Sequence, residues 1–169
     1  DPLQRSALRS LMSGGPPDLV YSSTQTAYLD RFDADMWFQL GRAVEVGVAL
    51  IGEHPGDTVE LSRSPAAVEI DLVADATGDV TLSATVILDG EPVHLDEARS
   101  GLLGGRPHGL WRRDGGRLQL VPFVAPIHPT VARLATGAEL RVPAEDVDEL
   151  LDLYQPALAR HATVGSSDG

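Results

Sequence analysis

The chain has 169 residues, of which 43% are hydrophobic and 22% are charged, and these values are typical of one globular domain rather than of a disordered polymer. It contains no cysteine and no lysine, which excludes disulfides, thiolate metal sites, cysteine nucleophiles, Schiff-base chemistry and a lysine-containing phosphate-binding loop. The formal net charge of −12 opposes binding of a polyanion over the whole surface.

The N-terminal part, residues 1–52, is predicted to be mainly helical. Apolar residues recur on one helical face over residues 3–12, and a Gly-Pro segment follows. Residues 26–32 could form a further helix. Asp33 or Asp35 could cap a helix that runs from Met36 toward Leu50. Alternating valines near the end of that segment leave open a strand there.

Residues 57–125 are predicted to form strands, because apolar residues there alternate with polar ones. The dipeptide Asp89-Gly90 is a strong hairpin signal, and Pro92 favours an edge position for the strand that follows. A second hairpin is expected at residues 109–123, with its turn at residues 114–116. Consecutive strands joined by tight turns predict a mainly antiparallel sheet.

Residues 126–162 return to a helical pattern. Thr130 could cap a short helix that ends at Gly137. Pro143 is suited to the first position of an acidic amphipathic helix, which we expect Pro156 to kink or interrupt near Asp152. The apolar stripe of this helix, which its spacing predicts to be buried, consists of Val147, Leu150, Leu151, Tyr154 and Leu158.

These patterns predict a single α+β domain over residues 1–169, a mainly antiparallel sheet of two hairpins flanked by N-terminal and C-terminal helices. Residues 163–169 are interpreted as the start of a linker to a further domain. We expect a cytoplasmic protein without a membrane partner, because no apolar run approaches the ~20 residues that span a bilayer and cysteine is absent.

Two short motifs suggest chemistry, but each has a simpler interpretation. The segment from Gly165 to Gly169 matches the G-x-S-x-G nucleophile elbow, yet every histidine lies upstream of it, whereas the chemistry needs one downstream. His94, Asp96 and Glu97 could form a metal or acid–base cluster, but a solvated turn is the simpler account of them. We therefore expect no catalytic residue, no cofactor and no metal site in this chain.

The segment from Arg99 to Arg117 is basic, with five arginines against one acidic residue, Asp114. Arginine binds phosphate bidentately, and tryptophan can stack on an unpaired base, so this segment is a candidate nucleic-acid-binding site. Its candidate residues are Arg106, His108, Trp111, Arg112, Arg113 and Arg117. The alternative is a hairpin whose arginines pair with the chain's own acids while the tryptophan fills the core.

Most of the chain resembles the region upstream of the motor in bacterial Snf-type (Swi/Snf-related) DEAD/DEAH-box helicases. The matching residues are Leu88-Asp89-Gly90, Pro107-His108-Gly109, His128-Pro129, Leu134, Leu140-Arg141-Val142-Pro143, Asp146, Leu150, Tyr154-Gln155-Pro156, Leu158, His161-Ala162-Thr163-Val164 and Ser166-Ser167-Asp168. The resemblance implies an accessory domain that precedes an ATP-hydrolysing, DNA-translocating motor in the same chain. No catalytic residue carries over, because the ATPase motifs are not in these residues.

The expected function is therefore that of a non-catalytic N-terminal domain, which orients a helicase motor or contacts DNA or a partner protein. The alternative is a stand-alone protein–protein interaction module that uses its acidic C-terminal helix. A third possibility, an enzyme built on the His94 cluster, has the least support.

Overall fold

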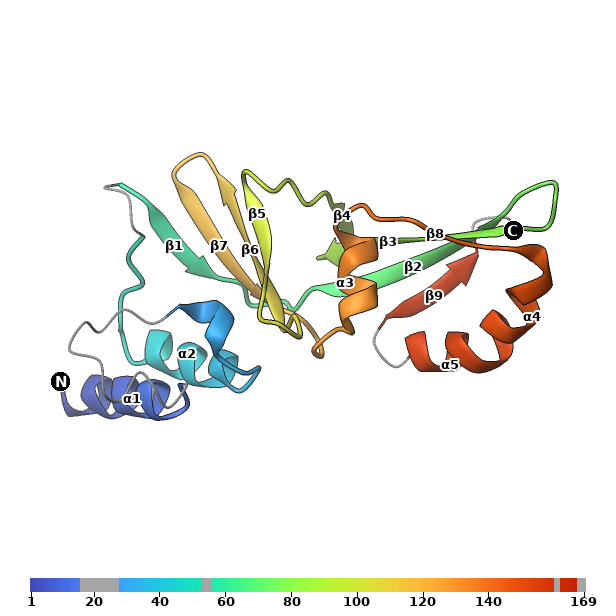
Figure 1. Cartoon of the computed structure of the whole chain (residues 1–169). Helices are drawn as coiled ribbons and strands as arrows, with labels where there is room; N and C mark the ends of the chain where they lie inside the picture. The colour runs from blue at the N-terminus through green and yellow to red at the C-terminus, as the bar shows by residue number, and fades with distance from the viewer. Residues whose placement is uncertain (16–27, 53–55, 160–161, 167–169) are drawn as a thin grey trace.

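The computed structural model describes residues 1–15, 28–52, 56–159 and 162–166. The fold is α+β, with two mainly antiparallel sheets rather than the single one expected (Figure 1). Helices α1 (Pro2–Ser13) and α2 (Met36–Glu45) lie beneath the first sheet at one end of the elongated molecule (Figure 1). The second sheet and the C-terminal helix form the other end, and α3 (Pro129–Ala135) lies between the two ends.

The first sheet has the strand order β1-β7-β6-β5. Its strands are β1 (Thr58–Leu61), β5 (Ser100–Leu103), β6 (Gly109–Asp114) and β7 (Arg117–Pro122). Strands β6 and β7 form the expected second hairpin, in which Asp114 is paired with Arg117. Only β1 runs parallel to its neighbour in this sheet. The sheet holds most of the basic segment.

The second sheet has the order β4-β3-β2-β9, and β8 also pairs with β3. Its strands are β2 (Ala67–Ala74), β3 (Val80–Leu88), β4 (Glu91–Val93), β8 (Leu140–Val142) and β9 (Thr163–Ser166). The turn at Asp89-Gly90 has positive φ angles of 54° and 83° at its two residues, as the predicted hairpin requires. Pro92 lies on the edge strand β4, where its missing N–H costs no ladder hydrogen bond.

One continuous hydrophobic core joins the two sheets. It combines side chains of β2 and β3 with those of β6, β7 and α3, among them Ile70, Leu82, Leu110 and Val131, all at most 1% exposed. The two sheets are linked along the backbone at Ala66, which forms an isolated parallel bridge with Phe123.

The structure corrects several expectations about helix ends. Helix α2 ends at Glu45 rather than near Leu50, because the chain turns at Gly47 with φ of 85° and residues 48–50 are irregular. The side chain of His128, not of Thr130, caps α3, and the backbone N–H of Thr130 donates to His128 Nδ1 at 3.2 Å. Gly137, with φ of 94°, follows the end of α3 as expected.

The C-terminal helical segment is continuous but changes its winding. It consists of η3 (Ala144–Asp146), a 3₁₀ turn, α4 (Val147–Glu149), the π-helical turn η4 (Leu150–Tyr154) and α5 (Gln155–Leu158). Pro156 can donate no hydrogen bond to Asp152 and would crowd its carbonyl group in an α-helix, so the expected interruption near Asp152 takes the form of a wider turn.

Two further expectations about this part are wrong. Residues 163–166, interpreted as the start of a linker, form strand β9 and pair in parallel with β2. The apolar stripe is buried only in part, because Leu150 is 6% exposed whereas Leu151 and Tyr154 are 41% and 55% exposed. A π-turn does not keep the 3.6-residue period from which the stripe was derived.

Residues 16–27 and 53–55 lie outside the described part of the chain, as do residues 160–161 and 167–169. The first residues of the possible helix at 26–32 therefore cannot be placed, and its end forms the 3₁₀ turn η2 (Leu29–Arg31). The second half of the G-x-S-x-G match also lies outside the described residues, while Gly165 belongs to β9.

Candidate functional site

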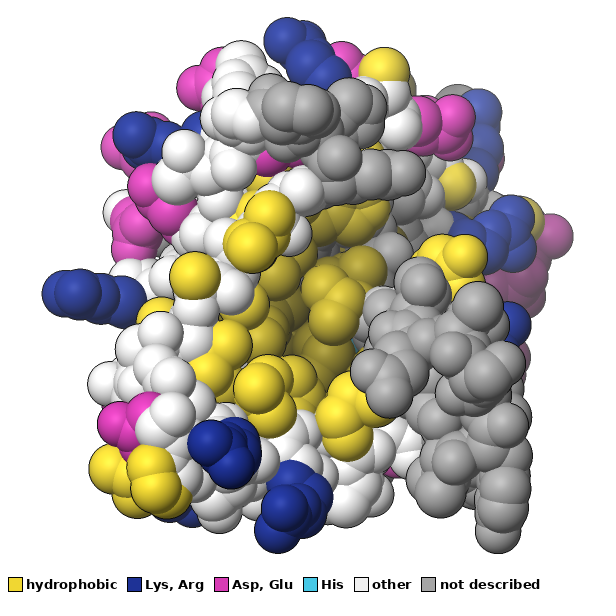
Figure 2. Space-filling view, turned by 90° about the vertical axis from the view of Figure 1, so that its left-hand side faces the viewer, with side chains coloured by type: hydrophobic (Ala, Val, Ile, Leu, Met, Phe, Trp, Pro, Cys, Tyr) yellow, Lys and Arg dark blue, Asp and Glu magenta, His cyan; other side chains and the backbone are white. Residues whose placement is uncertain are grey.

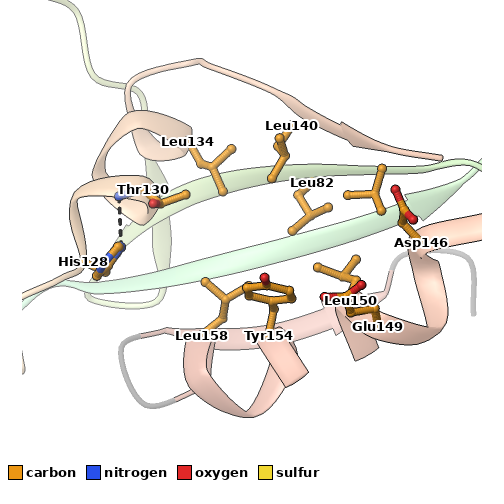
Figure 3. Close-up of a pocket in the computed structure, with 11 residues that line it drawn as sticks. Leu82, His128, Thr130, Leu134, Leu140, Asp146, Glu149, Leu150, Tyr154 and Leu158 are labelled. Atoms are coloured by element: carbon orange, nitrogen blue, oxygen red, sulfur yellow. Dashed lines mark hydrogen bonds between the residues drawn. The ribbon is translucent and has the colours of Figure 1, made fainter. Parts of the chain in front are cut away.

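A groove of about 630 Å³ lies between the second sheet, α3 and the C-terminal helical segment (Figure 3). Its volume is within the range of about 300–1,000 Å³ that is usual for binding pockets. One wall comes from β3, β8 and α3, and the opposite wall from the segment α4-η4-α5. The residues that line it are Leu82, His128, Thr130, Leu134, Leu140, Val142, Asp146, Glu149, Leu150, Tyr154 and Leu158. We call this site the apolar groove.

The floor and the rim of the apolar groove differ in exposure. Leu82, Leu134 and Leu150 are at most 6% exposed and belong to the hydrophobic core. Leu140 on β8 and Tyr154 on η4 lie on opposite sides of the groove (Figure 3), and they are 43% and 55% exposed. An occupant could therefore cover two large apolar side chains that the chain itself leaves in contact with water.

The turn between β2 and β3 holds the strand and the helix that border the groove. Arg141 of β8 forms ion pairs with Asp75 at 2.8 Å and with Asp79 at 2.9 Å. The backbone N–H of Ala144, at the start of the helical segment, donates to Asp79 Oδ1 at 3.0 Å. Hydrogen bonds from Thr77, followed by the charge of Arg141, lower the pKa of Asp75 below its usual 3.8. These contacts hold β8 and the start of the helical segment against the turn between β2 and β3.

Charged and polar side chains occupy the two ends of the apolar groove. Asp146 and Glu149 lie at one end, and His128 and Thr130 lie at the other (Figure 3). His128 already accepts the backbone hydrogen bond that caps α3. Asp146 and Glu149, in contrast, form no ion pair with any residue that the structure describes. The groove thus offers apolar surface along its length and two available carboxylates at one end.

Three arginines of the basic segment are engaged by acids of the same chain. Arg113 Nη1 lies 2.9 Å from both carboxylate oxygens of Asp57, whose side chain is only 6% exposed. Arg117 lies 3.5 Å from Glu60, and Arg99 lies 3.0 Å from Asp96. This arrangement is the alternative that the sequence left open, in which the arginines pair with the chain's own acids.

Among the candidate residues for nucleic acid, Arg106 and Arg112 form no ion pair with a described residue. Trp111 is half-buried beside Gly101, where a Cβ atom would come within 2.6 Å of its indole nitrogen. Arg106, Trp111 and Arg112 therefore stay available in part for contact with a nucleic acid, whereas Arg113 and Arg117 would first have to leave their carboxylates.

His108 is buried, at 4% exposure, and acts as a structural residue between α2 and the first sheet. Trp37 Nε1 of α2 donates to His108 Nδ1 and to the His108 carbonyl oxygen, both at 2.9 Å. The indole ring lies against Gly109, where a Cβ atom would collide with Trp37 Cζ2. Trp37 lies in the helix that was predicted to begin at Met36, but nothing in the sequence linked it to a histidine 71 positions away.

Burial lowers the pKa of His108 below its usual 6.5, and the carbonyl of Phe32 and the charge of Asp33 oppose this shift only in part. The Nδ1 atom accepts from Trp37, so the neutral ring carries its proton on Nε2. Protonation of the ring would disrupt the contact with Trp37.

The His94 cluster forms a turn. The carboxylate of Asp96 accepts from the backbone N–H of Ala98 at 3.0 Å and from Arg99 Nε at 3.0 Å. These two bonds, the backbone bond first, lower the pKa of Asp96 below its usual 3.8. Within the described residues, no three His, Cys, Asp or Glu side chains are grouped so that they could hold a metal ion.

Figure 2 shows a second apolar hollow at the end of the molecule that α1, α2 and the first sheet form. The exposed large hydrophobic side chains of this part include Leu3, Phe38 and Ile51, which are 65%, 66% and 85% exposed. The groove at the other end is the better defined site, because charged side chains there distinguish one end from the other.

Among the described helices, none combines the length and the hydrophobicity that crossing a bilayer requires. Comparison with protein-family models, with curated proteins and with solved structures finds no match for this chain.

Proposed function

We propose that this chain is the non-catalytic N-terminal domain of an ATP-dependent Snf-type DNA helicase or translocase, and that the apolar groove holds the motor in position. The observation that carries the proposal is the groove itself. Its floor belongs to the hydrophobic core, yet Leu140 and Tyr154 at its rim are exposed. Covering exposed apolar surface stabilises a complex by about 25 cal/mol per Å² before the costs of association.

Part of the resemblance lies at this groove. Eight of its eleven lining residues are among those that match the region upstream of the helicase motor. They are His128, Leu134, Leu140, Val142, Asp146, Leu150, Tyr154 and Leu158.

The lining of the groove suits packing better than catalysis. Aliphatic side chains and one tyrosine form most of it, and its only histidine is engaged as a helix cap. A catalytic pocket requires a nucleophile, an acid–base pair or a metal close to the reacting atoms. The apolar groove presents instead a surface that another protein segment can fill.

A stand-alone interaction module is the second candidate, and the acidic C-terminal segment favours it. Residues 144–158 contain five acidic residues and no basic residue. The two candidates predict the same groove contact, but they differ in what the gene should encode after Gly169. A motor with a phosphate-loop lysine encoded after Gly169 agrees with the helicase, and a stop codon there contradicts it.

The full-length protein allows the docking role to be measured. We expect the double variant Leu140→Ser with Tyr154→Ser to reduce DNA-stimulated ATP hydrolysis severalfold, because it removes apolar contact at the rim. The matched control is Val124→Ser with Leu153→Ser, which changes two apolar residues that are more exposed, at 72% and 65%, and do not line the groove. Equal rates for both variants would contradict a motor-positioning groove.

The 169-residue chain alone should neither bind nor hydrolyse ATP, because it has no lysine with which to hold the triphosphate. Calorimetry with ATP and Mg²⁺ tests this expectation. Micromolar binding would place a nucleotide site in this domain and contradict its non-catalytic role.

A further inference from the structure

We propose that the occupant of the apolar groove is a basic amphipathic helix, whose apolar face packs between the two walls and whose arginine or lysine side chains pair with Asp146 and Glu149. The inference rests on the proposed function, because it specifies the chemistry of the segment that the groove holds.

The shape of the groove favours a helix. Side chains from β3, β8 and α3 form one wall, and side chains from η4 and α5 form the other. Of the sheet strands at this site, β3 is paired on both sides, and β8 has only three residues, Leu140–Val142, which is short for the addition of another strand. Recognition through apolar side chains spaced i, i+3, i+4 and i+7 suits a groove with two apolar walls.

The negative charge at one end of the groove favours an occupant with positive charge. Asp146 and Glu149 are three positions apart on the same segment and lie at one end of the groove (Figure 3). Neither forms an ion pair with a described residue. The acids of this segment that do not line the groove are Glu145, Asp148 and Asp152, and they add to the same negative potential. An acidic helix would be repelled, and a basic one would be attracted and oriented with its cations at this end.

The positions of the acidic residues allow direct ion pairing with the bound helix to be distinguished from attraction by the overall negative charge. Asp148 and Asp152 lie on the same segment as Asp146 and Glu149, but they do not line the groove. Neutralising either pair changes the net charge by the same amount. Only the removal of the Asp146 and Glu149 charges would take direct partners away from the bound helix.

The test is a titration of the 169-residue chain with three labelled peptides, measured by fluorescence anisotropy. Each peptide has about four helical turns with leucines at i, i+3, i+4 and i+7, and blocked termini that remove the end charges. They differ only in two residues at one end, which are arginine, glutamine or glutamate. We expect the arginine peptide to bind about fivefold to tenfold more tightly than the glutamine peptide at low salt, as two partly screened ion pairs would give.

Two matched variants then locate the effect. Asp146→Asn with Glu149→Gln should reduce the advantage of the arginine peptide to less than about twofold, whereas Asp148→Asn with Asp152→Asn should keep most of it. The double variant Leu140→Ser with Tyr154→Ser should weaken all three peptides alike. Circular dichroism melts show whether each variant is folded.

The outcomes distinguish this inference from the proposed function. Equal affinities for the three peptides, or equal reductions in the two charge variants, would overturn the basic helix and leave groove docking in place. If no peptide binds, groove docking itself is overturned, and the inference with it. The same follows if the serine substitutions at the rim leave the peptide affinities unchanged.

Discussion

The basic segment and the apolar groove are both candidate interaction surfaces, and they differ in what the rest of the chain does with them. In the basic segment, Asp57 and Glu60 already pair with Arg113 and Arg117. At the groove, Leu140 and Tyr154 remain exposed and Asp146 forms no ion pair among the described residues. The basic segment was the candidate binding site in the sequence, yet more of its charged side chains are already paired within the chain than at the groove.

This difference shows how availability, rather than residue type, decides whether a group can bind a partner. An arginine that holds a nearly buried carboxylate would give up two short contacts with it if it turned to a phosphate, and that cost opposes binding. An exposed leucine or an unpaired carboxylate at a rim carries no such cost. The following predictions test this comparison, beginning with the largest expected effect.

The largest expected difference in stability is between variants of two neighbouring leucines in the C-terminal helical segment, Leu150 and Leu151. Leu150→Ala should lower the free energy of unfolding by about 2–5 kcal/mol, because its side chain is 6% exposed and belongs to the core. Leu151→Ala, at 41% exposure, should cost less than about 1 kcal/mol. Urea denaturation followed by circular dichroism measures both. Equal destabilisation would mean that both leucines are buried and that the stripe has no free face.

The second test concerns the paired arginines. Arg113→Gln should destabilise the fold by about 2–3 kcal/mol, since it removes the cation that lies 2.9 Å from both oxygens of the nearly buried Asp57 carboxylate. Arg117→Gln should cost less than about 1 kcal/mol, because the side chains of Arg117 and Glu60 are 65% and 45% exposed. Destabilisation of the same size in both would show that Arg113 is as free as Arg117, and the comparison would fail at this point.

The contact between Trp37 and His108 should make stability depend on pH. The folded pKa of His108 is below its unfolded value of 6.5, so the unfolded chain binds more protons as the pH falls. The free energy of unfolding should therefore decrease below about pH 6.5, by about 1.4 kcal/mol per pKa unit of depression, and level off below the folded pKa.

His108→Asn keeps a hydrogen-bond acceptor and removes the titrating ring. Its free energy of unfolding should change less than that of the wild type between about pH 5 and 7. Asp75 and Asp96 titrate lower, since their pKa values are held below 3.8, so they do not contribute in this window. Parallel pH profiles for the two proteins would rule out His108 as the cause.

The smallest expected effect is on DNA. The two arginines of the candidate set that form no ion pair with a described residue are Arg106 and Arg112, so the chain should bind DNA weakly at about 50 mM salt. Arg106→Gln with Arg112→Gln should reduce the log–log salt slope by about 0.7–0.9 for each phosphate that the protein no longer neutralises. Titration of labelled single- and double-stranded DNA measures the slope.

Arg117→Gln is the matched control, because its side chain is exposed but paired with Glu60. It should change the slope less than either unpaired arginine does. Trp111→Ala should weaken the binding of single-stranded DNA more than that of duplex DNA if the half-buried indole stacks on a base. An unchanged slope in the double variant would limit the domain to protein contacts.

The sequence by itself determined the fold class and many of the elements. Alternating apolar residues and the Asp89-Gly90 turn specify hairpins locally, because a period of two and two positive φ angles are properties of neighbouring residues. The α+β class with a mainly antiparallel arrangement is confirmed. The acidic C-terminal helix was expected from its pattern, although its winding changes at Leu150.

The tertiary structure alone decided which surfaces are available. Pairing of β9 with β2, the parallel strand β1, and the ion pair between Arg113 and Asp57 all join residues far apart in the chain, and no local pattern encodes such distances. The apolar groove arises in the same way, from β3, β8, α3 and a helix whose π-turn leaves Tyr154 at the rim. Periodicity predicts which side chains are apolar, but only packing between distant segments determines which of them stay uncovered.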